Sequence, residues 1–172
     1  GSYARRSLGG FLKKLGENGE VFEAVGVATL QPPAAISPTP AGSVDLVLAF
    51  RNVRSWRRAD QAEMMFATIA ESLKPGGILG IVQHRGSAEL TLEQMKKTAY
   101  VSEEKVIELA ELSGLELDAR SEINANPKDT KDHPRGVWTL PPTLAAGDEG
   151  REGYLAIGES DRMTLRFIKP AE

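Results

Sequence analysis

His84 and Arg85 lie two and three residues after the short apolar run at 78–82, and both carry side chains capable of chemistry. Such a run is typical of a buried parallel strand, and open α/β folds bind ligands beyond the carboxyl ends of their strands. There, a neutral His84 could accept a proton as a general base, and we assign Arg85 to substrate binding. The alternative for His84 is a histidine that only hydrogen-bonds a neighbouring loop.

Arg51, Asn52 and Arg54 follow a second apolar run, at 44–50. The same geometric rule places them at the ligand-binding edge of the sheet. We assign Arg51 and Asn52 to cofactor binding, since an amide can hold an amino or a carboxylate group. Arg54 is assigned to substrate binding. The alternative is that both arginines pair with surface acids, for about 0–1 kcal/mol each.

Polar residues are also concentrated in the segment 124–133. They are Asn124, Asn126, Asp129, Asp132 and His133. Carboxylates and imidazole can bind metals, but this spacing matches no established metal loop, and Asn-Pro and Asp clusters are ordinary turn chemistry. We therefore predict no metal site, and we assign Asn124 and Asn126 to substrate binding.

The composition excludes several classes of function. The 172 residues include 21 Lys+Arg and 24 Asp+Glu, for a net charge of −3, so no global positive field attracts nucleic acid or anionic membrane. The chain has no cysteine, which excludes disulfides, thiolate zinc sites and a cysteine nucleophile. No apolar run approaches the roughly 20 residues of a membrane span. We expect a soluble protein, cytoplasmic by default, although export stays open.

The N-terminal residues predict a helix followed by two short strands. Leu8, Phe11, Leu12 and Leu15 form a helical stripe that ends at Gly16. Residues 20–25 and 27–30 resemble strands, although only Gly26 separates them, too few residues for a parallel crossover. Four prolines within 32–40 then predict a loop.

The centre of the chain predicts a strand–helix–strand unit. The strands are the runs 44–50 and 78–82, and residues 62–73 repeat apolar side chains at helical spacing. Asp60 and Glu63 suggest a capping box for this helix, and Lys-Pro-Gly-Gly at 74–77 ends it. We expect Gly77 to need a positive φ at this reversal.

The C-terminal part predicts two further helix starts and two strands. Thr91 with Gln94 marks one start and Ser102 the other, whose helix stops at Gly114. Residues 115–123 and 163–168 alternate like strands, and 124–150 predicts a long loop.

Helices that alternate with strands favour an α/β fold, a Rossmann-like, doubly wound and mostly parallel sheet. The last two strands are predicted to form an antiparallel C-terminal edge. We treat 1–172 as a single domain.

The run Val-Asp-Leu-Val-Leu-Ala-Phe-Arg-Asn-Val at 44–53 and Leu-Lys-Pro-Gly-Gly-Ile-Leu-Gly at 73–80 carry a family resemblance. Together they resemble the central motifs of class I S-adenosylmethionine-dependent methyltransferases. The second half of the chain looks like a bacterial subgroup of predicted methyltransferases with unassigned substrates. That subgroup commonly has Arg-Asn-Val-His-Asn-Trp where this chain has Arg-Asn-Val-Arg-Ser-Trp at 51–56, so Arg54 replaces an imidazole with a fixed cation.

The resemblance implies S-adenosylmethionine as cofactor and a small-molecule substrate. It also implies a first strand and a glycine-rich loop, of which only the tail at Gly1 and Tyr3 has a counterpart here, so we expect a fold incomplete at its N-terminus. Gly1 and Tyr3 are assigned to cofactor binding on this basis; Gly1 and Ser2 as a cloning scar is the alternative.

The functional prediction is methyl transfer from S-adenosylmethionine to an unidentified acceptor. The main alternative is a non-catalytic remnant or binding module that keeps the sheet. A nicotinamide-dependent oxidoreductase is a third possibility, because a sheet alone does not identify a cofactor.

Overall fold

The computed structural model describes residues 2–30, 32 and 38–171, which divide into two compact units at residues 30/31. The first unit holds α1 (Ser2–Glu17) and α2 (Gly19–Phe22). The predicted N-terminal helix is thus confirmed. The predicted strand at 20–25 is wrong, because its first residues continue as helix, and 27–30 is irregular.

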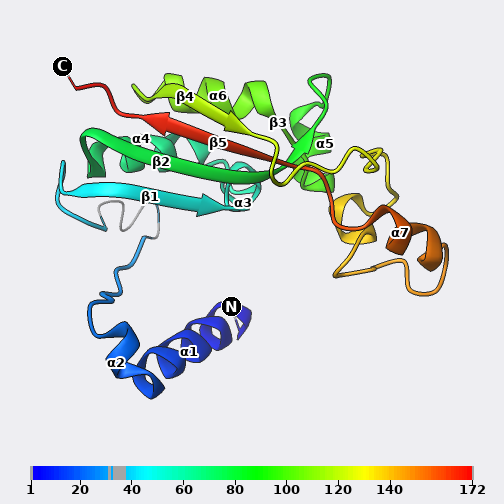
Figure 1. Cartoon of the computed structure of the whole chain (residues 1–172), viewed down its shortest axis with the longest axis horizontal. Coiled ribbons are helices and arrows are strands. Elements are labelled where there is room, and N and C mark those ends of the chain that lie inside the picture. Colours follow the sequence, from blue (N-terminus) through cyan, green and yellow to red (C-terminus); the bar gives the residue numbers. More distant parts are fainter. Residues whose placement is uncertain (1, 31, 33–37, 172) are drawn as a thin grey trace. The chain divides into compact units, whose positions relative to one another are not determined.

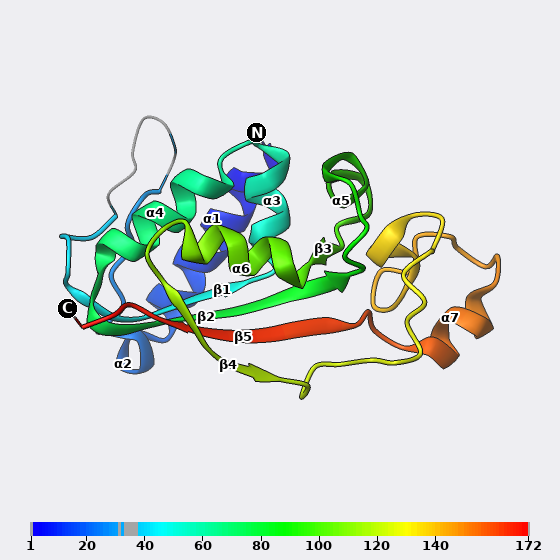
Figure 2. The same ribbon diagram turned by 90° about the horizontal axis from the view of Figure 1, so that it is seen from above.

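The second unit is a sheet with most of its helices on one face and its last helix beyond the ends of the strands (Figures 1 and 2). Its strands are β1 (Val44–Phe50), β2 (Leu73–Gly86), β3 (Val101–Ser102), β4 (Glu116–Ser121) and β5 (Arg162–Ile168). Its helices are α3 (Val53–Arg58), α4 (Ala62–Ser72), α5 (Leu92–Thr98), α6 (Glu103–Glu111) and α7 (Arg151–Ile157), with a 3₁₀ turn at Gly136–Thr139. None of these described helices is both long and apolar enough to cross a membrane.

The sheet is mixed, with the order β1-β2-β5-β4. β1 and β2 are parallel, and β3 extends this parallel pairing at the end of β2. β5 runs antiparallel to β2 and to β4. The α/β class and the antiparallel C-terminal pair are therefore confirmed.

The core lies between the sheet and α4 and α6. Phe66, Leu73, Leu79, Ile81 and Phe167 are almost fully buried there. The other face of β1 is exposed, since Leu46, Leu48 and Phe50 each retain more than half of their exposure. Alternation along the strand explains this contrast, because successive side chains point to opposite faces.

The chain reverses into β2 differently from the prediction. The helix ends at Ser72 and β2 begins at once, so Lys-Pro-Gly-Gly lies inside the strand. Gly76, not Gly77, has the positive φ, at 76°. Gly77 is required for another reason: a Cβ there would lie 2.8 Å from the Lys74 carbonyl oxygen.

The helix starts were predicted with mixed success. Thr91 and Gln94 form the expected capping box at α5, with both hydrogen bonds present. Ser102 does precede α6, without a side-chain cap. The box at Asp60 and Glu63 is wrong, because α4 is preceded by Gln61 and has no side-chain cap. α7 and the 3₁₀ turn also interrupt or border the segment expected to be a plain loop.

Candidate active site

His84 lies near the carboxyl end of β2, opposite Arg162 on the antiparallel strand β5. Its Nδ1 lies 2.6 Å from the Ser160 hydroxyl, which comes just before β5. The segment 122–161 crosses beyond the carboxyl ends of β1 and β2, as Figure 2 shows. The ring is therefore held between a strand end and the segment that closes over it.

Burial and positive charge keep the His84 imidazole neutral. Burial lowers its pKa from 6.5 to about 4, and the guanidinium groups of Arg162, Arg51 and Arg54 add to this shift. Asp129 opposes it more weakly. A neutral ring at physiological pH is able to accept a proton, as a general base must.

Arg51 and Asn52 form the turn between β1 and α3. Arg51 adopts a left-handed conformation with φ 62°, and its N–H donates to the Val82 carbonyl at 2.7 Å. The Asn52 carbonyl accepts from the N–H groups of Ser55 and Trp56 and so starts α3. The Asn52 side chain is exposed and makes no hydrogen bond with the residues that the structure describes. Its amide is available to a ligand.

Arg54 lies on α3 with its guanidinium 4.5 Å from the centre of the Trp138 ring. Burial lowers its pKa, and nearby Arg58 contributes. Its Nε is buried and has no hydrogen-bond partner within the described part of the chain. The cation–π contact with Trp138 thus fixes the orientation of the Arg54 guanidinium, and its Nε–H makes no hydrogen bond with the described residues.

Arg85 points away from this group into a cluster of carboxylates. It makes bidentate contacts with Asp161, at 3.0 and 3.1 Å, and with Glu122, at 2.5 and 2.9 Å. Glu103 lies 3.6 Å from it. Burial opposes ionisation of Asp161, but Arg85 and Lys131 lower its pKa to about 2. All three nitrogens of Arg85 are engaged, so the side chain joins β2 to α6 and to the 122–161 segment.

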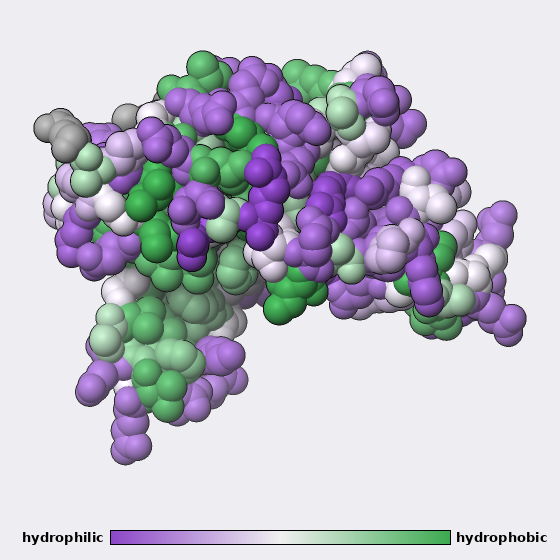
Figure 3. All heavy atoms as spheres, turned by 45° about the horizontal axis from the view of Figure 1, so that its top comes forward, coloured by the Kyte–Doolittle hydropathy of each residue, from purple (hydrophilic) through white to green (hydrophobic). Residues whose placement is uncertain are grey.

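Asn124 and Asn126 also hold the chain in place. The Asn124 amide donates to the Thr164 hydroxyl at 2.8 Å. Asn126 donates to the carbonyl oxygens of Ile157 and Glu159, at 2.9 and 2.6 Å. Both nevertheless line a cavity of about 270 Å³ that also includes Ser160 and Arg162, next to His84. On the face drawn in Figure 3, hydrophilic side chains predominate over this end of the unit.

Asp129 is a buried carboxylate that the sequence pointed to only as turn chemistry. It accepts hydrogen bonds from the Tyr100 hydroxyl at 2.9 Å, from the Asp161 N–H at 2.8 Å and from the Lys131 N–H at 3.0 Å. His133 Nε2 lies 2.8 Å from it. The described residues contain no group of three side chains arranged to hold a metal ion. Asp129 is a structural centre of the 122–161 segment.

Ser160 and Arg162 were not predicted as site residues. Both contact or face His84, but they lie almost 80 residues further along the chain. Only the antiparallel register of β2 and β5 brings them to it, and no local motif marks that register. Gly1 lies outside the described residues. Tyr3 lies in α1 of the first unit, so the cofactor roles of Gly1 and Tyr3 stay predictions.

The site therefore combines a neutral base with a cationic rim. His84 can accept a proton, the exposed Asn52 amide can hold a polar group, and Arg51, Arg54 and Arg162 provide positive charge around them. Arg162 is partly neutralised by an ion pair with Glu159. Such a site suits proton abstraction from a polar, negatively charged small molecule.

Solved structures of other proteins have a similar fold. The [4+2]-cyclase SpnF is 20% identical, with a TM-score of 0.52 over 80% of this chain and 55% of that one. A chain from the complex between the Haloferax volcanii Trm112 methyltransferase activator and a methyltransferase is 20% identical, with a TM-score of 0.50 over 78% of this chain and 57% of that one. An S-adenosylmethionine-dependent methyltransferase from Methanosarcina mazei is 12% identical, with a TM-score of 0.48 over 77% and 62%.

These likenesses concern the fold. No protein-family model and no curated protein sequence matches the chain. The chain spans a little over half the length of the solved structures above. Within that span, the sequence prediction is confirmed: the chain has the α/β fold of the class I S-adenosylmethionine-dependent methyltransferases.

Proposed function

We propose that this chain forms part of an enzyme that transfers a methyl group from S-adenosylmethionine to a small molecule. The observation that carries the proposal is the neutral His84 at the carboxyl end of β2, within a methyltransferase fold. Ligands of open α/β sheets bind at this edge. A base held there is in the place where an acceptor would lose its proton.

The described residues fit one end of the cofactor. S-adenosylmethionine carries an amino acid group, and the exposed Asn52 amide, together with the Arg51 cation, suits the carboxylate of that group. Arg51 has a left-handed backbone conformation, which turns the chain directly after β1 and places Arg51 and Asn52 at the end of that strand. Asn52 and Arg51 are therefore the residues that we assign to holding the cofactor. When bound, the cofactor supplies an electrophilic methyl group.

The hydrogen bond to Ser160 decides which nitrogen of His84 can act. If Nδ1–H donates to the Ser160 oxygen, the lone pair lies on Nε2, the nitrogen that does not contact Ser160. In that tautomer, Nε2 accepts the proton of the acceptor group while Ser160 fixes the ring. Ser160 is then a positioning residue, and His84 is the catalytic one.

The charge around His84 selects the acceptor. Arg54 and Arg162 each keep a buried Nε with no partner in the described part of the chain, and a negatively charged group would satisfy such donors. We infer a small acceptor that carries a carboxylate or similar anion beside its nucleophile. Binding of that anion would orient the nucleophile toward Nε2.

A binding module without methyl transfer is the second candidate. The similarity to a structure described as a [4+2]-cyclase indicates that this fold serves more than one activity, so the fold by itself does not require methyl transfer. In this case the same edge would hold a ligand, and His84 would only hydrogen-bond the 122–161 segment.

Two measurements test the proposal. Calorimetric titration with S-adenosylmethionine should show binding to the chain or to a longer protein that contains it, and Asn52→Ala should weaken that binding. In an active preparation, His84→Ala should lower turnover by roughly 10²–10⁴-fold with nearly unchanged cofactor affinity. Binding that survives without any transfer of labelled methyl groups would favour the binding module. No binding by any form would refute the proposal.

A further inference from the structure

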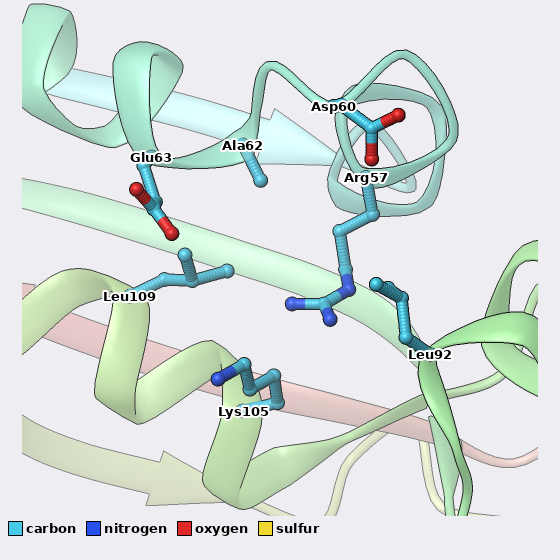
Figure 4. A pocket seen from close by; sticks show the side chains of 7 residues that line it. All are labelled: Arg57, Asp60, Ala62, Glu63, Leu92, Lys105 and Leu109. Atoms are coloured by element: carbon cyan, nitrogen blue, oxygen red, sulfur yellow. The ribbon is translucent and has the colours of Figure 1, made fainter.

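A second cavity lies on the helical side of the sheet, among α3, α4, α5 and α6. It has a volume of about 300 Å³. Its lining residues are Arg57, Asp60, Ala62, Glu63, Leu92, Lys105 and Leu109 (Figure 4). None of the residues assigned to the candidate active site lines it.

Arg57 is the unusual feature of this cavity. Its side chain points from α3 into the space between Leu92 and α6, as Figure 4 shows. The residue is only 8% exposed, and its Nε is buried without a hydrogen-bond partner. The guanidinium makes no ion pair with any side chain that the structure describes. Burial is the largest influence on this group and lowers its pKa, so the guanidinium is incompletely satisfied and would gain from an anionic ligand.

The acids nearby attract Arg57 without contacting it: burial lowers its pKa by more than Glu108, Asp60 and Glu63 raise it, and none of the three forms an ion pair with it in the described part of the chain. Asp60 pairs with Lys96, and Lys105 in the cavity wall pairs with Glu108, each at 2.5 Å. Glu63 lines the cavity on the α4 side and makes no ion pair with the described residues. The cavity thus contains the guanidinium of Arg57 and the carboxylate of Glu63, which attract each other but are not in ion-pair contact.

This arrangement specifies the charge of a ligand. A doubly charged phosphate would gain from Arg57 but would be repelled by Glu63 and Asp60. A ligand with one negative and one positive group matches Arg57 and Glu63 and leaves the charge of the wall balanced. The planar guanidinium suits a carboxylate in particular, because it can donate two parallel hydrogen bonds. Leu92, Leu109 and Ala62 provide apolar contact beside them.

We propose that this cavity binds a small zwitterionic amino acid with an apolar side chain. Its carboxylate lies across the guanidinium of Arg57, its ammonium group faces Glu63, and its side chain packs on Leu92 and Leu109. The site is separate from the methyl-transfer site and does not depend on that function.

The test uses three probes that differ by one charged group. L-Leucine carries both groups, 4-methylpentanoate lacks the ammonium group, and 3-methylbutylamine lacks the carboxylate. Calorimetry and thermal unfolding of the chain should show binding of leucine, at least about tenfold weaker binding of 4-methylpentanoate, and none of the amine. Equal binding of phosphate or of the amine would overturn the proposal, as would no binding of leucine at millimolar concentration.

Variants assign the contacts. Arg57→Met should abolish leucine binding and raise the unfolding temperature of the unliganded chain, because it removes a buried unpaired charge. Arg58→Met, which changes the exposed neighbour on the same helix, should do neither. Glu63→Gln should weaken leucine without weakening 4-methylpentanoate. Leucine binding that survives in Arg57→Met would refute the site. A raised unfolding temperature would show that this variant is folded, so that a loss of binding could not be explained by unfolding.

Discussion

The neutral state of His84 makes a prediction about stability that does not require any activity. In the folded protein its pKa is about 4, against 6.5 for the unperturbed group. As the pH falls below 6.5, the unfolded chain binds a proton that the folded chain resists. The free energy of unfolding therefore declines from about pH 6.5 downward, and this decline is complete once the pH is below about 4.

The size of the effect follows from the shift. One pKa unit corresponds to 1.36 kcal/mol, so the full shift gives about 3 kcal/mol, and about 2–3 kcal/mol is expected because the ring keeps some contact with solvent. His84→Gln can still bond to Ser160 but does not titrate. Its stability relative to that of the native chain should therefore rise by this amount between pH 7 and pH 4.

Urea denaturation of both proteins at several pH values measures this difference directly. His133→Gln is the matched control, since it changes the other of the two histidines. Carboxylates titrate in the same range but are common to the native chain and the His84 variant, so they cancel in the comparison. Parallel pH profiles for the native chain and His84→Gln would show that His84 is not held neutral by burial and the nearby arginines.

Three further perturbations test other parts of the structure. Gly77→Val should lower the free energy of unfolding by about 1–3 kcal/mol, because a Cβ would lie 2.8 Å from the Lys74 carbonyl oxygen; an unchanged denaturation midpoint would contradict this clash. Asp129→Asn should cost about 1–3 kcal/mol, since the amide would turn a donor toward one of the groups that now donate to the carboxylate, and Tyr100→Phe should cost less. Arg85→Met should increase amide exchange in the 122–161 segment, whereas similar protection in the variant would show that the segment is held by other contacts.

The sequence predicted those parts of the fold that depend on local pattern. β1 is an apolar run bounded by turn residues, and α5 begins with a capping box that only neighbouring residues are needed to form. The N-terminal strands failed because Glu20 and Val21 fit either a strand or a short helix. The direct helix-to-strand reversal at Leu73 was missed because Pro75 and the two glycines are typical of a turn outside the sheet.

For each contact in the site, the sequence predicted one of the two residues and not its partner. His84, Arg51 and Asn52 could be placed at the sheet edge, because each lies within two residues of the end of a predicted strand. Their partners could not, since Ser160 and Arg162 reach this edge through the pairing of β2 with β5. Arg57 was missed for a similar reason: burial of its guanidinium depends on α6, which begins 45 residues after α3 ends.

His84 and Arg85 show why position along a strand is not enough to assign a role. Adjacent strand residues point to opposite faces, so one enters the cationic group and the other meets three carboxylates. Arg85 is surrounded by the charge that it needs, and its bonds hold the segment from which Ser160 reaches the imidazole. His84 is buried, and the charge around it is mainly positive, so it stays neutral. The same pair of residues thus gives the edge one group that fixes the closing segment and one neutral imidazole, the group to which we assign proton transfer.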